Sequence, residues 1–258
     1  MKKANNREMA DVLRPEYDLS KLKGGVRGKH MKQFKQGTNL VLLSAHGGKL
    51  SNYARDKFIA PFMSAFSSAD IPDMSSYCDQ STHWVSNFVL NTMYRINIAS
   101  PSRQYLFNYL RRAEAAFRQH DLARKATSEF LAGSRQSPSQ YMMAIFHWEV
   151  FLSQAWHAYN LLRYFCSMDK LFERGQGSVE ERLHRLYTQS KHTESVIKDG
   201  NFPKEATIAV WLTNDGLSSN DTQLSYQETA DILKELSKWA MVLQDPGTIP
   251  EKLKAMQP

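Results

Sequence analysis

Apolar residues recur at helical spacing over most of the chain after residue 45. This spacing predicts helices over 51–69 and over about 75–98, and Pro61 is expected to kink or break the first of them. The segment 138–165 is apolar on most of its sides, so its helix should occupy a central position in the fold.

Helix boundary signals divide this region further. Ser-Pro pairs at 100–101 and 137–138 each place an N-cap residue before a proline at the first helical position. The two helices that they open are expected to end near Gly133 and Gly175. Gln140 is placed to complete a capping box with the second serine.

Two more capping boxes predict the remaining helices. Ser178 with Glu181 should open a helix that ends at Gly200. Ser225 with Glu228 should open the last helix. The chain is therefore expected to contain five or six helices.

β-structure is expected in only two short segments. Residues 207–212 are a β-compatible run followed by an Asn-Asp-Gly turn at 214–216, and residues 40–43 are a short apolar run after a turn signal. We therefore predict a mainly α protein, with a multi-helix bundle over 46–258 and a basic arm over 1–45 that carries one short β-strand.

Positive charge is concentrated in the arm. Residues 1–36 contain ten Lys or Arg against four Asp or Glu, so they carry six of the seven net positive charges of the chain. Such an excess suits contact with RNA or another polyanion, or with an acidic partner protein. A tail that only remains hydrated is the alternative.

Composition indicates where the protein works. The chain has 258 residues, 42% of them hydrophobic, which is enough for one sizeable core. The polar N-terminus does not resemble a secretory signal, and no apolar run approaches the roughly 20 residues of a membrane span. Cys78 and Cys166 lie in unrelated contexts, which favours a reducing compartment. We expect a cytoplasmic protein without a membrane partner.

Most common chemical motifs are missing. A Gly-Gly-Lys segment at 47–49 lacks the other residues of a phosphate-binding loop, and neither G-x-S-x-G nor H-E-x-x-H nor a dinucleotide fingerprint occurs. Cys78 with His83 lacks a third catalytic group. We therefore predict no metal and no cofactor.

A polar stripe runs along the central helical segment, at Glu149, Ser153, His157 and Asn160. A stripe of this kind can hold a metal or a catalytic acid. Because buried polar groups are usually hydrogen-bonded, we favour an internally satisfied seam over a site.

The arm contains a string that resembles short bacterial proteins. The string comprises Arg14-Pro15-Glu16-Tyr17-Asp18, Gly24-Gly25-Val26-Arg27-Gly28-Lys29-His30 and Gly37-Thr38-Asn39-Leu40-Val41. It is similar to the pattern P-E-Y-D-F, G-G-V-R-G-K-Y and G-T-N of type II toxin–antitoxin antitoxins, although Leu19 and His30 replace aromatic residues. The resemblance implies a bacterial origin and a toxin–antitoxin or defence context, and it does not imply a reaction. Arg27 and Lys29 are candidate RNA-binding residues because they belong to the basic arm.

The strongest chemical constellation lies on the helix opened by Ser178. Arg185 and His192 are seven positions apart, so on a continuous helix they fall within about 20° of each other. The apolar residues of this segment gather on the opposite side, at Val179, Leu183, Leu186, Tyr187 and Ile197.

A guanidinium beside an imidazole can hold a phosphodiester and transfer protons near neutral pH. Lys191 and Gln189 flank the pair and are further candidate RNA-binding residues. A solvated helix face without a function is the alternative.

The Arg185-x6-His192 spacing resembles the signature of the HEPN superfamily, whose helical bundles often act as metal-independent ribonucleases in toxin–antitoxin and phage-defence systems. The resemblance implies catalytic roles for both residues and an active site formed across a homodimer. Leu186 stands where many catalytic members have a polar residue. A non-catalytic interaction protein, whose arm binds an acidic partner or nucleic acid, is the second hypothesis.

Overall fold

The structure is a computed structural model that describes residues 51–133, 137–200, 207–245 and 247. The chain divides into two compact units, Met1–Gly48 and Lys49–Pro258, and the described residues all belong to the second. The strand expected at 40–43, the basic arm and the candidate residues Arg27 and Lys29 lie outside the described residues.

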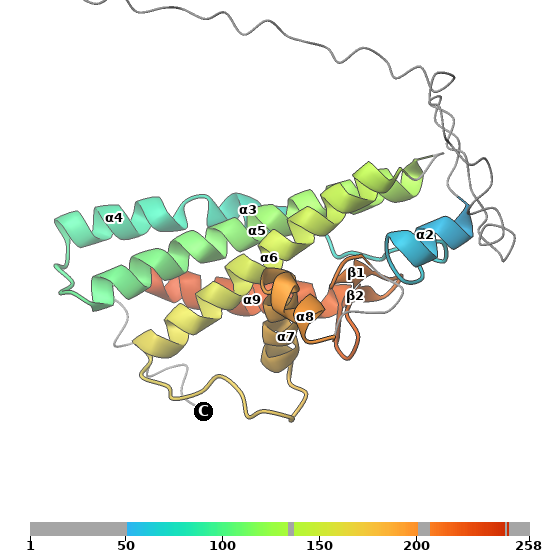
Figure 1. Ribbon diagram of the computed structural model, residues 1–258. Helices are drawn as coiled ribbons and strands as arrows, with labels where there is room; N and C mark the ends of the chain where they lie inside the picture. Colours follow the sequence, from blue (N-terminus) through green and yellow to red (C-terminus); the bar gives the residue numbers. More distant parts are fainter. Residues whose placement is uncertain (1–50, 134–136, 201–206, 246, 248–258) are drawn as a thin grey trace, which may run out of the picture. The chain divides into compact units, whose positions relative to one another are not determined.

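Two long helices form the centre of the second unit. α5 spans Ser102–Ala132, α6 spans Pro138–Phe165, and they lie side by side as an antiparallel hairpin (Figure 1). Their contact is largely apolar, but it also contains a buried hydrogen bond from Trp148 Nε1 to Thr127 Oγ1 of 3.1 Å. α6 is central, as its apolar sequence predicts.

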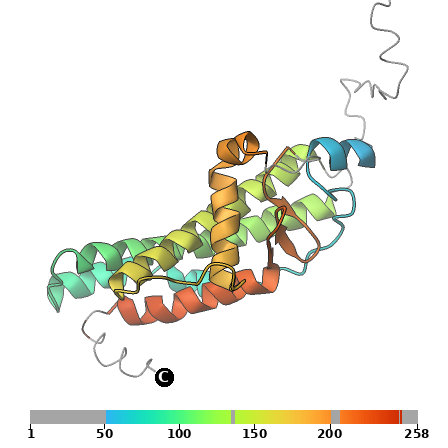
Figure 2. The same cartoon turned by 60° about the horizontal axis from the view of Figure 1, so that its bottom comes forward.

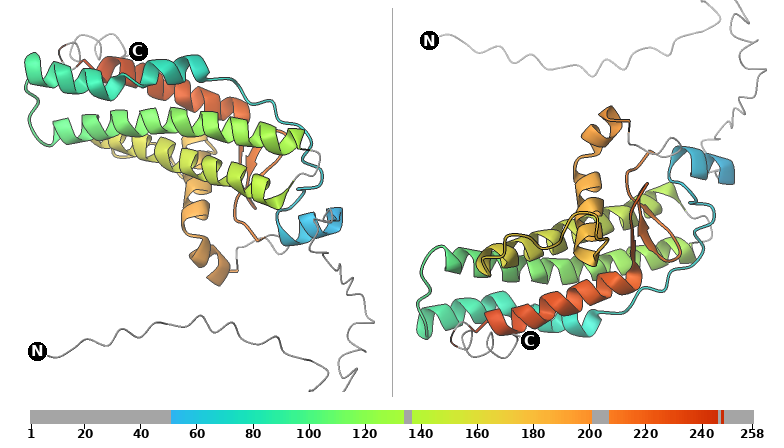
Figure 3. Two further views of the ribbon diagram at one scale, coloured as in Figure 1. Left: turned by 90° about the horizontal axis from the view of Figure 1, so that it is seen from above. Right: turned by 90° about the horizontal axis from the view of Figure 1, so that it is seen from below.

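Three further helices complete the bundle. α3 (Ser75–Ser81) and α4 (Trp84–Tyr94) pack along α5, and α9 (Tyr226–Leu243) contacts α4, α5 and α6 (Figure 3). Tyr109 of α5 donates a buried hydrogen bond of 2.8 Å to the carbonyl of Leu236 in α9. The prediction of a mainly α, multi-helix fold is confirmed for the described residues.

A small antiparallel sheet lies at one end of the bundle. Its strands are β1 (Trp211–Leu212), β2 (Gly216–Ser218) and β3 (Gln223–Ser225), in the order β1-β2-β3. Gly216 is required in β2, because a Cβ atom there would lie 2.1 Å from the carbonyl oxygen of Leu224.

The remaining helices lie outside the bundle core. α7 (Val179–Lys191) crosses α6, and α8 (Thr193–Lys198) follows it after a bend (Figure 2). α2 (Asn52–Phe58) precedes Pro61, where the sequence predicts a break. None of the helices in the described part of the chain has the length and apolarity that crossing a membrane requires.

Several predicted helix boundaries are wrong. The helix expected over 75–98 is divided into α3 and α4. α6 ends ten residues before Gly175, because Ser167 adopts a positive φ of 55° and the Met168 N–H donates back to the Arg163 carbonyl.

Two predicted caps also differ. Ser100 is not the N-cap of α5, since Pro101 occupies that position and the helix begins at Ser102. Ser137 is the N-cap of α6 with Pro138 in the first turn, but its side chain makes no capping hydrogen bond, so the expected box with Gln140 does not form. The capping box of Ser225 and Glu228 is confirmed in full.

The polar stripe of α6 is only partly satisfied. His157 Nε2 lies 3.2 Å from the Tyr187 hydroxyl, and Asn160 accepts a hydrogen bond from Arg163. Among the described residues, Glu149 and Ser153 have no side-chain hydrogen-bond partner. Burial raises the pKa of Glu149 from 4.5 to about 7.

Glu149→Gln should therefore stabilise the protein in a pH-dependent way. The folded state holds the proton to a higher pH than the unfolded state, so stability falls as pH rises through the interval from 4.5 to about 7. We expect the variant to be more stable by roughly 2–3 kcal/mol at about pH 8 and equal at about pH 4. Urea unfolding at both pH values tests this, and an equal difference at both would contradict it.

Candidate functional site

α7 is fixed in place by its first turn. The Ser178 hydroxyl accepts a hydrogen bond of 3.3 Å from the N–H of Glu181 and caps the helix. Arg182 donates from Nη1 and Nη2 to the two carboxylate oxygens of Glu228, and its Nη1 also donates to the carbonyl of Gln223 at 2.9 Å. This fork joins α7 to the corner between β3 and α9, so the orientation of its later turns is set by the bundle.

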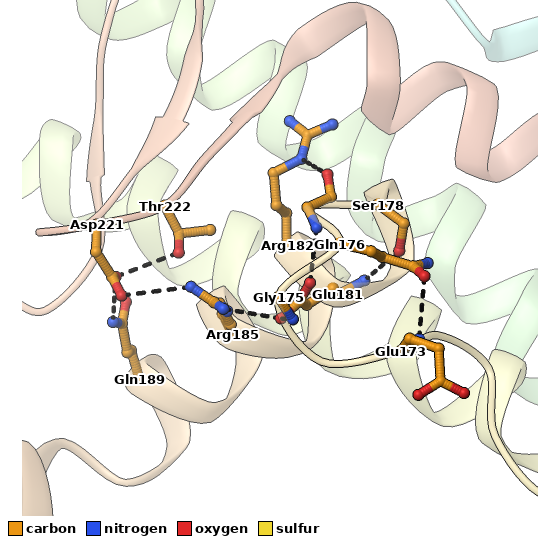
Figure 4. A network of polar contacts seen from close by, with 11 residues as sticks. Glu173, Gly175, Gln176, Ser178, Glu181, Arg182, Arg185, Gln189, Asp221 and Thr222 are labelled. Carbon is orange, nitrogen blue, oxygen red and sulfur yellow. Dashed lines mark hydrogen bonds and ion pairs between the residues drawn. The ribbon is translucent and has the colours of Figure 1, made fainter.

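Glu181 organises the loop before α7. Its carboxylate accepts hydrogen bonds of 2.8 Å from the backbone N–H groups of Gly175 and Gly177, and a third of 2.8 Å from Arg185 (Figure 4). The two backbone hydrogen bonds, together with Arg185, lower the pKa of Glu181 to about 2. Since this carboxylate turns toward the loop, it does not complete the capping box with Ser178 that the sequence predicts.

Arg185 lies between two carboxylates. Besides its bond to Glu181, its Nη1 is 3.7 Å from Oδ2 of Asp221, and Gln189 donates to the other oxygen of Asp221 at 3.1 Å (Figure 4). The Arg185 side chain remains 43% exposed. The predicted outward direction of Arg185 is therefore confirmed, but its guanidinium and the Gln189 amide already have partners within the protein.

His192 is the residue at which α7 ends. Its N–H donates to the Thr188 carbonyl at 2.9 Å, and its backbone departs from helical geometry with φ −107° and ψ 38°. Its side chain is exposed. The preceding Lys191 is also exposed, and its ammonium lies 5.5 Å from the centre of the Tyr187 ring.

The structure does not bring the predicted catalytic pair into contact. Within the described residues, no hydrogen bond or ion pair joins Arg185 to His192. The expected alignment of these side chains assumed a helix that continued to Gly200, whereas α7 ends at Lys191. The same bend leaves Ile197, which was expected on the buried side, 56% exposed.

A second feature of this surface is a pair of adjoining hollows. One, of about 320 Å³, is bordered by Arg185, Gln189 and Asp221, and the other, of about 580 Å³, is bordered by Trp156 and Lys170. Three residues border both hollows, namely Phe172, Arg174 and His184. The sequence does not predict this site, because its residues come from α6, from the loop before α7, from α7 itself and, at Asp221, from the turn between β2 and β3.

Comparison with known proteins does not assign this chain to a family or a fold. No family model, curated protein or solved structure matches this chain. The residues that the structure describes also contain no group of three or more His, Cys, Asp or Glu side chains that could hold a metal ion.

Proposed function

We propose that this protein binds RNA on the α7 surface and cleaves it without a metal ion, as a HEPN-like protein of a bacterial toxin–antitoxin or phage-defence system in the cytoplasm. The observation that carries the proposal is the exposed end of α7, where Lys191 and His192 follow an exposed Arg185 two turns earlier. Cationic side chains bind phosphates, and imidazole is suited to proton transfer near neutral pH.

The proposed reaction is attack of a ribose 2′-oxygen on the adjacent phosphorus. The 2′-hydroxyl loses its proton to a base, the bond to the 5′-oxygen breaks, and that oxygen receives a proton from an acid. The products are a 2′,3′-cyclic phosphate and a 5′-hydroxyl. His192 acts as base or acid, and in a homodimer His192 of a second copy supplies the other role.

Arg185 would stabilise the negative charge that develops on the phosphate oxygens. To do so, its guanidinium must exchange the long contact with Asp221 for the phosphate while it keeps the bond to Glu181. The 3.7 Å separation from Asp221, compared with 2.8 Å from Glu181, makes Asp221 the weaker partner.

RNA binding can be tested separately from cleavage. Fluorescence anisotropy with a labelled single-stranded RNA at several salt concentrations should show an affinity that falls as salt rises. Lys191→Ala should make the negative slope of log affinity against log salt less steep by about 0.7, because one phosphate contact is lost. Lys238→Ala removes an exposed lysine of α9 and serves as the matched control. Equal slopes for the two variants would contradict the proposed surface.

The second candidate function is a non-catalytic interaction protein, whose basic arm binds an acidic partner or nucleic acid. The ion pairs of Arg185 with Glu181 and Asp221 favour it, because they offset the charge that a phosphate would otherwise meet. Binding without any cleavage would support this candidate.

A further inference from the structure

The larger hollow beside α7 has the dimensions of a ligand site. It measures about 580 Å³ and lies among α6, the loop that follows α6, and α7. Hollows of roughly 300–1,000 Å³ are typical of sites for small molecules and cofactors. It shares His184 with the smaller hollow that Arg185 borders.

Three aromatic rings form one wall of this hollow. The ring centres of Trp156 and His184 are 4.2 Å apart with planes inclined by 34°, and Phe172 lies 5.6 Å from His184. Trp156 and His184 are each only partly buried. Partly exposed aromatic rings that border a hollow are surfaces on which nucleobases stack, because every base has a flat π face.

The same wall carries hydrogen-bonding groups that have no partner. Within the described part of the chain, neither Trp156 Nε1 nor a ring nitrogen of His184 forms a hydrogen bond. Burial, followed by the nearby Arg174, lowers the pKa of His184. A neutral imidazole has one donor and one acceptor nitrogen, which is what the edge of a base requires.

Cationic side chains also border the hollow, at Arg163, Lys170 and Arg174. Arg174 is exposed and makes no hydrogen bond or ion pair with the residues that the structure describes. Lys170 is paired with Glu173, and Arg163 donates to the Asp169 carbonyl at 2.6 Å. Arg174 is therefore the cation best able to accept a phosphate, and its planar fork matches phosphate geometry.

We propose that this hollow binds one nucleotide, with its base against Trp156 and His184 and its phosphate at Arg174. The nucleotide is either a free mononucleotide or one residue of a single-stranded RNA. If the nucleotide is a residue of an RNA, the inference rests on the proposed function, and the hollow then holds a base beside the scissile phosphate. Mononucleotide binding does not require cleavage.

The test is isothermal titration of the full-length protein with AMP and with a 12-residue oligoadenylate. Adenosine, which lacks the phosphate, and ribose 5-phosphate, which lacks the base, complete the set. We expect AMP to bind more tightly than either fragment. Binding of AMP and the oligonucleotide identifies a nucleotide site, and binding of the oligonucleotide alone identifies RNA as the source.

Two variants assign the binding to the hollow. Arg174→Ala should weaken binding of the phosphorylated ligands by about tenfold and leave adenosine unchanged. Trp156→Leu should weaken adenosine and AMP alike, and Trp156→Phe should retain most of the affinity because it can still stack. Arg118→Ala removes an exposed arginine of α5 and is the matched control. Circular dichroism verifies that each variant is folded.

The proposal is overturned if neither AMP nor the oligonucleotide binds, or if Arg174→Ala and Arg118→Ala behave alike. RNA cleavage that persists in either case would leave the proposed function standing without the hollow. If AMP binding depends on Arg174 but the protein cleaves no RNA, the nucleotide site is supported and the proposed ribonuclease activity is contradicted.

Discussion

Replacing His192 with alanine is expected to lower the rate of RNA cleavage by about 100- to 10,000-fold, which is the range that a general acid or base contributes. RNA binding should change by less than about threefold, because the variant removes a proton-transfer group and leaves Lys191 and Arg185 in place. Initial cleavage rates and anisotropy with the same labelled RNA provide both numbers.

His83→Ala is the matched control for this variant. His83 is also exposed and lies at a helix boundary, as the N-cap residue of α4, where its side chain makes no capping hydrogen bond. It should cleave at the wild-type rate. Equal cleavage rates for the His192→Ala and His83→Ala variants would show that His192 takes no part in the reaction.

Replacing Trp148 with alanine is expected to lower the free energy of unfolding by about 3–5 kcal/mol. Trp148 is fully buried in α6, and its ring packs against Phe151 at 5.7 Å and Tyr226 at 5.5 Å between centres. The variant leaves a cavity between α5, α6 and α9. It also removes the donor to Thr127, whose hydroxyl is buried.

Urea unfolding of Phe146→Ala provides the comparison for this loss. Phe146 lies in the same helix but is 55% exposed, so its removal should change the stability by no more than about 0.5 kcal/mol. A cost below about 1 kcal/mol for Trp148→Ala would show that the α5–α6 contact is not the core of the fold.

Local signals in the sequence predict most of the helices but not all of their ends. The Ser225 and Glu228 capping box was predictable, because all of its atoms belong to four consecutive residues. The end of α6 was not, because Ser167 adopts a left-handed conformation that is usually associated with glycine. The bend at His192 carries no Gly or Pro signal either.

The candidate site was predictable only along α7. Helical spacing correctly placed Leu183 and Leu186 on the buried side and Arg185 on the exposed side. It could not show the contact of Arg185 with Asp221, because that pairing depends on how the β2–β3 turn packs beside α7. Contacts between distant segments leave no periodic pattern in the sequence.

The hollow beside α7 was hidden for the same reason. Trp156, Phe172 and His184 are each unremarkable in sequence, and they form one wall only because α7 crosses α6. An aromatic residue in the loop that follows a central helix is the one local signal that could have pointed to it.

The most direct test of the central claim is incubation of purified wild-type protein with total cellular RNA and with tRNA in the presence of EDTA. We expect fragments that end in a 2′,3′-cyclic phosphate to accumulate in this reaction and to be absent from a parallel reaction with His192→Ala. Intact RNA after prolonged incubation with folded protein would contradict this expectation and would leave the α7 surface as a binding site alone.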